Sequence, residues 1–221
     1  RQDRSEDALA HTERALALAR RTLAPGDTRL ADAWNTHGNV LRTLKRTEEA
    51  RAAFTTARDI WSKAFGPEHP AMIVAFGNMA IMEAETGEAE RAIRAFDDGA
   101  ALVRRVLGPR HPQVGSFLNN GGFVLARVGR LEEAHAHFEE AVRHWRETLG
   151  EGSPKVAMAL HNLASVEGEQ GELTAARAHL EEAMSIRAKT LGPKSPSYGD
   201  DLAVLGDLQR LAGGRERATA S

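Results

Sequence analysis

Cysteine is absent from the 221-residue chain, and aromatic residues make up only 5% of it. Without cysteine there are no disulfides and no thiolate metal ligands. With so few aromatic side chains, the interior must be built mainly from Ala, Leu, Val and Met, which favours helix packing over a β-sandwich. No apolar run approaches the roughly 20 residues of a membrane span, and the first residues lack a signal peptide's hydrophobic stretch. We therefore expect a cytoplasmic helical protein with no membrane partner.

Charge of one sign is not in excess either. Lys and Arg number 29 against 31 Asp and Glu, a net charge of −2, so no basic surplus attracts nucleic acid. The sequence has no Gly-x-Ser-x-Gly motif, no Gly-rich phosphate loop and no nucleophilic Cys. The pairs Asp97-Asp98 and Asp200-Asp201 are adjacent on predicted helices, so their side chains diverge and are expected on the surface. We expect no catalytic residue and no enzyme activity.

A step of 42 residues runs through the chain. It links the turn prolines Pro25, Pro67, Pro109 and Pro193, with Glu151 in the fourth place. Three further series keep the same step: Thr36, Asn78, Asn120 and Asn162; Ala50, Ala92, Ala134 and Ala176; Phe54, Phe96, Phe138 and Leu180. Several series in phase indicate an internal repeat.

Each repeat is predicted to contain two helices. In the third repeat, residues 111–129 begin with His-Pro, where Pro fits the first helical position, and end near a Gly. Residues 130–149 place small and apolar side chains at i, i+3 and i+4 spacing, which is typical of an amphipathic helix. Asp27, Ser153 and Ser195 are good N-cap residues at equivalent positions. The predicted fold class is all-α, a solenoid of antiparallel helix pairs.

The positions of the small residues within the repeat indicate which class of helical solenoid this is. With Gly115 as position 1, position 8 is Gly or Ala, position 20 is Ala and position 24 is Phe or Leu. This resembles the tetratricopeptide repeat, whose two helices touch at positions 8 and 20, so we expect Gly122 to pack against Ala134. The usual unit has about 34 residues. The longer variant, with LGPxHP and LNNLA-like segments, resembles the repeats of kinesin light chain and of actinomycete-like bacterial signalling ATPases and regulators. The resemblance implies a right-handed superhelical solenoid.

The repeat divides residues 1–221 into parts of a single solenoid. Residues 1–23 align with a second helix alone, and residues 192–221 with a first helix, ending near residue 212, and a tail. Between them lie four full repeats, at 24–65, 66–107, 108–149 and 150–191. An array that starts and stops at half a repeat is expected to be part of a longer protein. Its end helices, with Leu202, Leu205 and Leu208 uncovered, are expected to associate with another copy of the chain.

In the tetratricopeptide family the first helices line a concave groove. The resemblance places ten residues of this sequence on it: Asn35, Asn39, Arg42, Asn78, Asn119, Asn120, Phe123, Arg127, His161 and Asn162. Asn is poorer than Ala in a helix interior by several tenths of a kcal/mol, so a recurring Asn needs a reason. Each amide offers a donor and an acceptor to a peptide main chain. Alternatively, the position 6 asparagines tie neighbouring first helices together, and both interpretations stay open.

Four of these groove residues have alternative interpretations. Arg42 and Arg127 suit ligand carboxylates, although acidic residues alternate with them and a mixed solvated surface explains them as well. Phe123 suits a ligand side chain or the edge of the core. Asn39 matches the Asn of the carboxylate clamp of some co-chaperones, but that clamp needs Lys where Asn35 stands, so a clamp is disfavoured.

Metal and cofactor sites are not expected. Among the nine histidines, His135 and His137 are two residues apart on a helix and diverge, and no pair has the i, i+4 spacing that zinc chemistry favours. Trp61 and Trp145 share one register and are expected in the core. The predicted function is a protein–protein interaction module that binds a peptide or helix in its groove, within a larger regulatory or scaffolding protein. The alternative is self-association into a homo-oligomer through the end helices.

Overall fold

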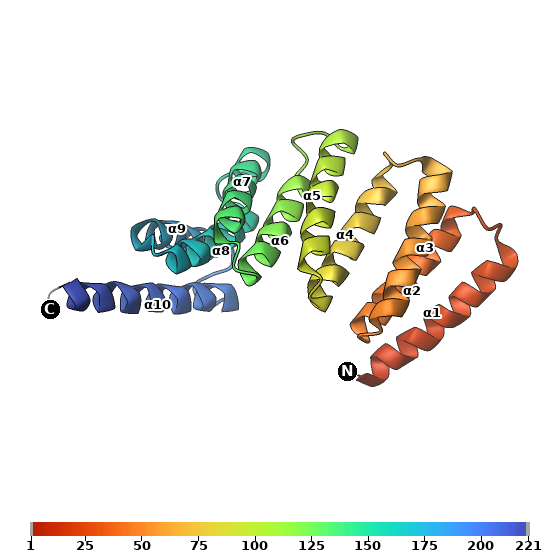
Figure 1. Ribbon diagram of the computed structural model, residues 1–221, viewed down its shortest axis with the longest axis horizontal. Helices are drawn as coiled ribbons and strands as arrows, with labels where there is room; N and C mark the ends of the chain where they lie inside the picture. Colours follow the sequence, from red (N-terminus) through yellow and green to blue (C-terminus); the bar gives the residue numbers. More distant parts are fainter. Residues whose placement is uncertain (1, 220–221) are drawn as a thin grey trace. The chain divides into compact units, whose positions relative to one another are not determined.

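The computed structural model describes the backbone of residues 2–219 and the side chains of residues 6–212. This part of the chain contains ten α-helices and no β-strand, which confirms the predicted all-α class (Figure 1). The helices are α1 (Gln2–Thr22), α2 (Thr28–Thr43), α3 (Thr47–Phe65), α4 (Pro70–Thr86), α5 (Ala89–Val106), α6 (Gln113–Arg127), α7 (Leu131–Leu149), α8 (Pro154–Gln170), α9 (Leu173–Thr190) and α10 (Pro196–Thr219). None of the described helices is both long and apolar enough to cross a membrane.

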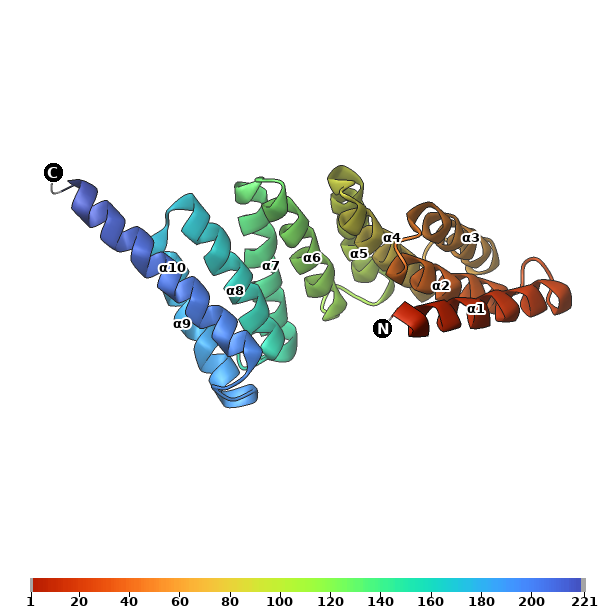
Figure 2. The same cartoon turned by 90° about the horizontal axis from the view of Figure 1, so that it is seen from below.

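The helices form two compact units, residues 1–109 and 110–221. In unit 1, α1 packs on α2, α2 pairs with α3, α3 packs on α4, and α4 pairs with α5. In unit 2, α6 pairs with α7, α7 packs on α8, α8 pairs with α9, and α10 packs on α9. Within each unit, Figures 1 and 2 show consecutive helices side by side and antiparallel. The predicted solenoid of helix pairs is therefore confirmed.

The turns between paired helices use a left-handed residue at one recurring position. Gly87 and Gly171 cap α4 and α8 with φ of 84°, and Gly129 follows α6 with φ of 77°. Lys45 holds the equivalent position after α2 with φ of 62°. A side chain makes this conformation costly, which is why Gly is the usual residue there.

The starts of the first helices confirm some predicted caps and correct others. Asp27 and Ser153 accept hydrogen bonds from the helix N–H groups two residues on, as predicted. His69 and His111 do the same through Nδ1, at 3.2 and 3.3 Å from the nitrogens of Ala71 and Gln113, because an imidazole lone pair replaces the usual oxygen. Ser195 stands at the predicted cap position, where its main-chain oxygen accepts from the N–H groups of Tyr198 and Gly199, but its buried Oγ has no hydrogen-bond partner among the described residues.

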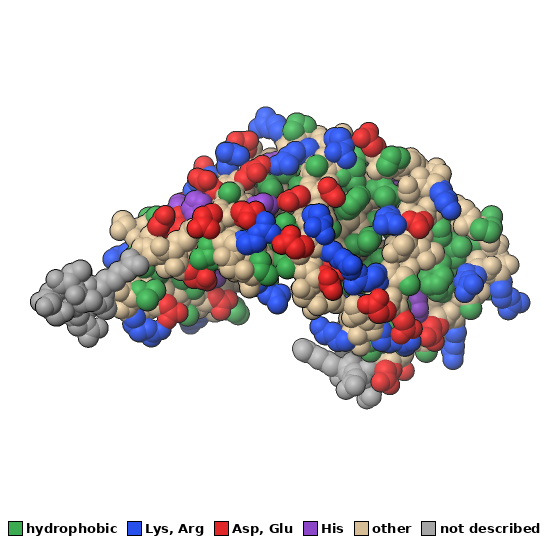
Figure 3. Space-filling view, viewed as in Figure 1, with side chains coloured by type: hydrophobic (Ala, Val, Ile, Leu, Met, Phe, Trp, Pro, Cys, Tyr) green, Lys and Arg blue, Asp and Glu red, His purple; other side chains and the backbone are tan. Residues whose placement is uncertain are grey.

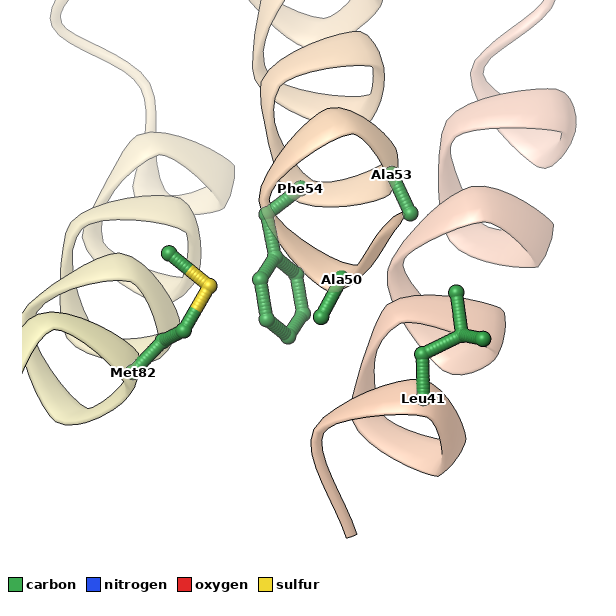
Figure 4. Packing of buried hydrophobic residues seen from close by; sticks show 5 residues of the cluster. All are labelled: Leu41, Ala50, Ala53, Phe54 and Met82. Carbon is green, nitrogen blue, oxygen red and sulfur yellow. The ribbon is translucent and has the colours of Figure 1, made fainter. Parts of the chain in front are cut away.

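The core of unit 1 forms where α3 lies against α2 and α4. Figure 4 shows Phe54 of α3 pointing into the space between Met82 of α4 and Leu41 of α2. All three side chains are at most 2% exposed. A Cβ on Gly38 would lie 2.8 Å from the Phe54 ring, so the small residue at position 8 is needed for this close approach.

Unit 2 has the same close contact at its own position 8 glycine, Gly122. The three atoms nearest to a Cβ on Gly122 belong to Phe138 and His137, at 2.9 to 3.1 Å. The nearest neighbours of Gly122 are thus the Phe138 ring at position 24 and His137, and the predicted partner Ala134 is fully buried. Trp145 is fully buried, and Trp61 of unit 1 is 5% exposed, which confirms both as core residues.

The last helix departs from the sequence predictions at several residues. It continues to Thr219, past the end expected near residue 212. Leu208 is 5% exposed and Leu205 packs beside it against α8 and α9, so the preceding repeat covers both and only Leu202, half exposed, matches the expectation. The surface prediction for Asp201 is also wrong, because its side chain is fully buried.

Candidate peptide-binding site

The recurring asparagines join neighbouring first helices within each unit. In unit 1, the Asn78 Nδ2 of α4 donates to the Asn35 Oδ1 of α2 at 2.7 Å. In unit 2, the Asn162 Nδ2 of α8 donates to the Asn119 Oδ1 of α6 at 3.0 Å. Each amide keeps further capacity, because the NH₂ group has two hydrogens and the oxygen two lone pairs. The structural role proposed for these amides is therefore present, and a ligand role remains compatible with it.

The other predicted groove residues of unit 1 are engaged by their own neighbours. The Asn39 Nδ2 donates to the main-chain oxygen of Asn35 at 3.1 Å. Arg42 forms an ion pair with Glu85 of α4 at 2.6 Å. The charged pair that alternates along this surface thus bridges α2 and α4.

Unit 2 contains a hollow between α6 and α8 that brings predicted residues together. It has a volume of about 280 Å³, and Phe123, Arg127, His161 and Asn162 all line it. The remaining lining residues are Ala126, Phe138, Ser165, Val166 and Glu169. Of these, only Glu169 was expected on the groove, as an acidic residue that alternates with the arginines. We call this surface the α6–α8 hollow. Asn119 and Asn120 do not line it: Asn119 is buried, whereas Asn120 is exposed and makes no side-chain hydrogen bond within the described residues of unit 2.

The α6–α8 hollow presents three kinds of group to a ligand. Phe123 is 53% exposed, an apolar ring with room for a partner side chain. Arg127 is exposed and takes part in no ion pair within the described part of the chain, so its guanidinium is free for a carboxylate. Asn162 offers its side-chain oxygen, since its Nδ2 already donates to Asn119. The combination suits an extended chain with an apolar and an acidic side chain.

The polar wall of the α6–α8 hollow is held in place by bonds to deeper groups. His161 Nδ1 lies 2.7 Å from the Oδ1 of the buried Asp201, which fixes the plane of the imidazole. The Ser165 Oγ donates to the main-chain oxygen of His161 at 2.9 Å. Ser165 stands one 42-residue step after Phe123, and this register is the signal that could have identified it from the sequence.

The sequence matches the family model of the tetratricopeptide repeat over residues 29–102, 72–147, 113–189 and 155–220. The chain therefore belongs to the tetratricopeptide repeat family. Repeats of this family mediate protein–protein interaction. A comparison with curated protein sequences gave no match.

Solved structures with the same architecture include proteins related to kinesin light chain, as the sequence resemblance predicted. BtubC (BKLC) from P. vanneervenii superposes with a TM-score of 0.81 at 19% identity, over 98% of this chain and 87% of that one. A kinesin light chain-type protein of Podosopora anserina with nearly identical TPR-like repeats gives 0.74 at 20% identity, over 86% and 90%. A Rap protein complexed with competence and sporulation factor gives 0.65 at 16% identity, over 97% and 61%. Identities this low establish the fold alone.

Proposed function

We propose that this chain is a protein-interaction module that binds a peptide or helix along its first helices, with the α6–α8 hollow as the principal contact. The observation that supports this most directly is the convergence of Phe123, Arg127, His161 and Asn162 on one hollow of about 280 Å³. Of the ten residues placed on the groove from the sequence, these four share a surface that a ligand can enter. The likeness to a Rap protein complexed with competence and sporulation factor adds support by analogy.

The chemistry of the α6–α8 hollow favours a ligand segment with one apolar and one acidic side chain. Phe123 supplies apolar contact area, and aromatic side chains dominate the energetics of such contacts. Arg127 supplies a guanidinium that can hold a carboxylate in a bidentate pair. Burying an acidic group beside Glu169 without engaging Arg127 would be unfavourable, so the two charges together also set the register of the ligand.

The experiment is selection of a displayed random peptide library on the immobilised chain, followed by affinity measurement of the enriched peptides. The double variant Phe123→Ala/Arg127→Ala should weaken the enriched peptides at least about tenfold, since a buried aromatic and a charge-assisted bond each contribute about 1–3 kcal/mol. The matched control is Leu191→Ala/Arg177→Ala, which removes an exposed apolar side chain and an exposed arginine at α9. Equal loss in both double variants would contradict the proposal.

We further propose that the module serves a larger cytoplasmic regulatory or scaffolding protein and acts without catalysis or cofactor. The family expectation of a binding role supports this. A pull-down with the full-length parent protein, compared with the same protein carrying Phe123→Ala/Arg127→Ala, tests it. A partner that is captured equally by both forms would show that the α6–α8 hollow is not its binding site.

Self-association is a second candidate function, favoured by apolar side chains exposed on both end helices. Leu18 of α1 is 60% exposed and Leu202 of α10 is 50% exposed. Contact between these faces in two copies would bury both leucines. Sedimentation equilibrium of the chain and of the Leu18→Lys/Leu202→Lys variant tests this alternative, and a wild-type chain that remains monomeric at high concentration would exclude it.

A further inference from the structure

Unit 2 contains a buried carboxylate that faces two histidines instead of a guanidinium. Glu167 of α8 is 2% exposed. Its Oε1 lies 3.5 Å from the Nε2 of His135 on α7, and its Oε2 lies 2.8 Å from the Nδ1 of His179 on α9. Figure 3 shows histidine and acidic side chains next to each other over this part of unit 2. Burying a charge is costly unless it is paired, so the partners of Glu167 decide what this cluster does.

The equivalent position in unit 1 shows what an ordinary structural pair looks like. Glu83 stands two repeats before Glu167, and Arg51 stands two repeats before His135. Glu83 is 5% exposed and forms an ion pair with Arg51. The guanidinium is permanently charged, so that buried carboxylate is always neutralised. In unit 2 the position of Arg51 is taken by His135, whose imidazole nitrogens can bind a metal ion.

A second carboxylate completes the cluster. Glu172 lies at the start of α9, and its carboxylate, the Glu167 carboxylate and a ring nitrogen of His135 all lie within 4.8 Å of one another. Glu172 stands one repeat after Arg130 and three after Arg46. Each of those arginines is paired with the glutamate three residues on. The turn that carries a cation in two other repeats therefore carries an anion beside the histidine.

We propose that His135, Glu167 and Glu172 bind a divalent transition-metal ion, with Zn²⁺ as the best match. Imidazole nitrogen and carboxylate oxygen are both zinc ligands. At zinc bond lengths of about 2.0–2.1 Å, two tetrahedral ligands lie about 3.3–3.4 Å apart, close to the 3.5 Å between His135 and Glu167. Two carboxylates balance the charge of the ion, and three protein ligands leave a fourth position for water or a partner's side chain.

His179 acts as a positioning residue rather than a ligand. Its Nδ1–H donates to the Glu167 oxygen that faces away from His135. A hydrogen bond of this kind fixes the orientation of a metal-binding carboxylate. The neighbouring Arg146 does not neutralise the Glu167 carboxylate, because its guanidinium pairs with Glu151 and Glu182 at 2.7 and 2.6 Å. Arg143 and Glu139 also line the same cavity of about 270 Å³.

The site joins three helices of two successive repeats. His135 belongs to α7, Glu167 to α8, and Glu172 to the turn that begins α9. A bound ion would therefore fasten repeat 3 to repeat 4 and should stabilise the folded state through linkage. The cluster and the α6–α8 hollow use different side chains, so this proposal does not depend on the proposed peptide-binding function.

The test is a calorimetric titration of zinc chloride into the chain after treatment with EDTA and dialysis. We expect one equivalent of zinc to bind and the melting temperature to rise, with EDTA reversing both effects. His135→Arg copies the Arg51–Glu83 pair, so it should retain the fold while losing the saturable zinc site and the rise in melting temperature. Glu172→Gln changes an exposed side chain and should also lose the site. His179→Gln should weaken binding roughly 10–100-fold.

The matched control is His137→Gln, which removes a histidine from the same helix outside the cluster. It should bind zinc as the wild type does. Substitution with cobalt gives an independent readout, since a tetrahedral site of nitrogen and oxygen ligands produces visible absorption bands that His135→Arg should lack. Zinc affinity of the wild type no higher than that of His135→Arg would overturn the proposal. Equal losses in His137→Gln and His135→Arg would also overturn it, because they would indicate only diffuse binding to surface histidines.

Discussion

The guanidinium of Arg187 and the carboxylate of Asp201 form a buried ion pair that ties α9 to α10. Asp201 is fully buried and Arg187 is 6% exposed. The Asp201 Oδ1 also accepts from His161 of α8, and the Arg187 Nη1 donates to the main-chain oxygen of Ser197. Three helices thus share one charged contact at the end of the α6–α8 hollow.

We expect Asp201→Asn to destabilise unit 2 by about 3–5 kcal/mol, because it leaves the buried Arg187 without a counter-charge. Asp200→Asn, at the exposed neighbouring position, should change the free energy of unfolding by less than about 0.5 kcal/mol. Urea titration followed by circular dichroism measures both. Similar losses for the two variants would contradict the buried pair. The double variant Arg187→Met/Asp201→Leu should recover much of the stability, because it removes both charges together.

The close packing of first and second helices predicts opposite effects of the same substitution at two glycines. A Cβ on Gly115 would lie 2.5 Å from the Nε1 of Trp145, which is itself fixed by a 2.9 Å hydrogen bond to the main-chain oxygen of Pro112. Gly115→Ala should therefore cost about 1–3 kcal/mol. Gly206→Ala in α10 meets no atom within 4 Å and should gain about 0.5–1 kcal/mol from helix propensity. Thermal melts of both variants check the sign of each change.

The two position 6 asparagines of unit 2, Asn120 and Asn162, should differ in their effects on stability. Asn162→Ala leaves the buried Asn119 oxygen without its donor and should cost about 1–3 kcal/mol. Asn120 is exposed, so Asn120→Ala should leave the melting temperature unchanged or slightly higher, since Ala is the better helix former. A peptide from the library selection that loses affinity for the folded Asn120→Ala variant would assign this amide to the ligand. Unchanged affinity would exclude the Asn120 amide from the peptide contact.

The packing of α1 on α2 should weaken at acidic pH. Burial lowers the pKa of His37 below its usual value, with Glu13, Arg46 and Glu49 as the charged neighbours. Thr12 of α1 lies 3.0 Å from its Nδ1. Because the folded pKa lies below the unfolded value of about 6.5, the unfolded chain binds the proton more readily. The stability contributed by neutral His37 is therefore present above that value and is lost as the pH falls through the folded pKa.

The measurement is the free energy of unfolding of the wild type and of His37→Leu between pH 7.5 and pH 5. Leu stands at the equivalent position of the fourth repeat as Leu163, so the substitution suits the site. The variant should show a shallower loss of stability on acidification. Identical slopes for the two proteins would show that His37 does not titrate on unfolding. A histidine NMR titration that gives His37 a pKa above 6.5 would reverse the sign of the argument.

Periodicity in the sequence was sufficient to predict the helices but not their lateral contacts. The second helix of the third repeat was expected at residues 130–149 and is α7, Leu131–Leu149. The helix predictions succeed because they depend on which face of a helix a residue occupies, and spacing along the chain determines the face. The resemblance to the tetratricopeptide repeat placed Phe123, Arg127, His161 and Asn162 on one groove, and all four line the α6–α8 hollow.

The errors concern pairs whose members are far apart in the sequence. Asp201 looked like a surface residue beside Asp200, because its partners Arg187 and His161 are 14 and 40 residues away. Rules for metal sites on a single helix likewise overlooked the approach of His135 to Glu167. Comparison of each repeat with the others supplies the missing signal, since an Arg–Glu pair in one unit becomes a His–Glu pair in the next.

The pairing of residues one repeat apart has a consequence for how the chain folds. The Asn78–Asn35, Asn162–Asn119 and Arg42–Glu85 contacts each join residues 43 positions apart. In each case the two helices are separated by only one other helix along the chain. Such local topology favours rapid folding, and stability accumulates as a sum of helix and nearest-neighbour terms. Hydrogen exchange should accordingly reveal a gradient of protection along the array. A destabilising substitution should lower protection in its own repeat and the adjoining ones, while distant repeats exchange at wild-type rates.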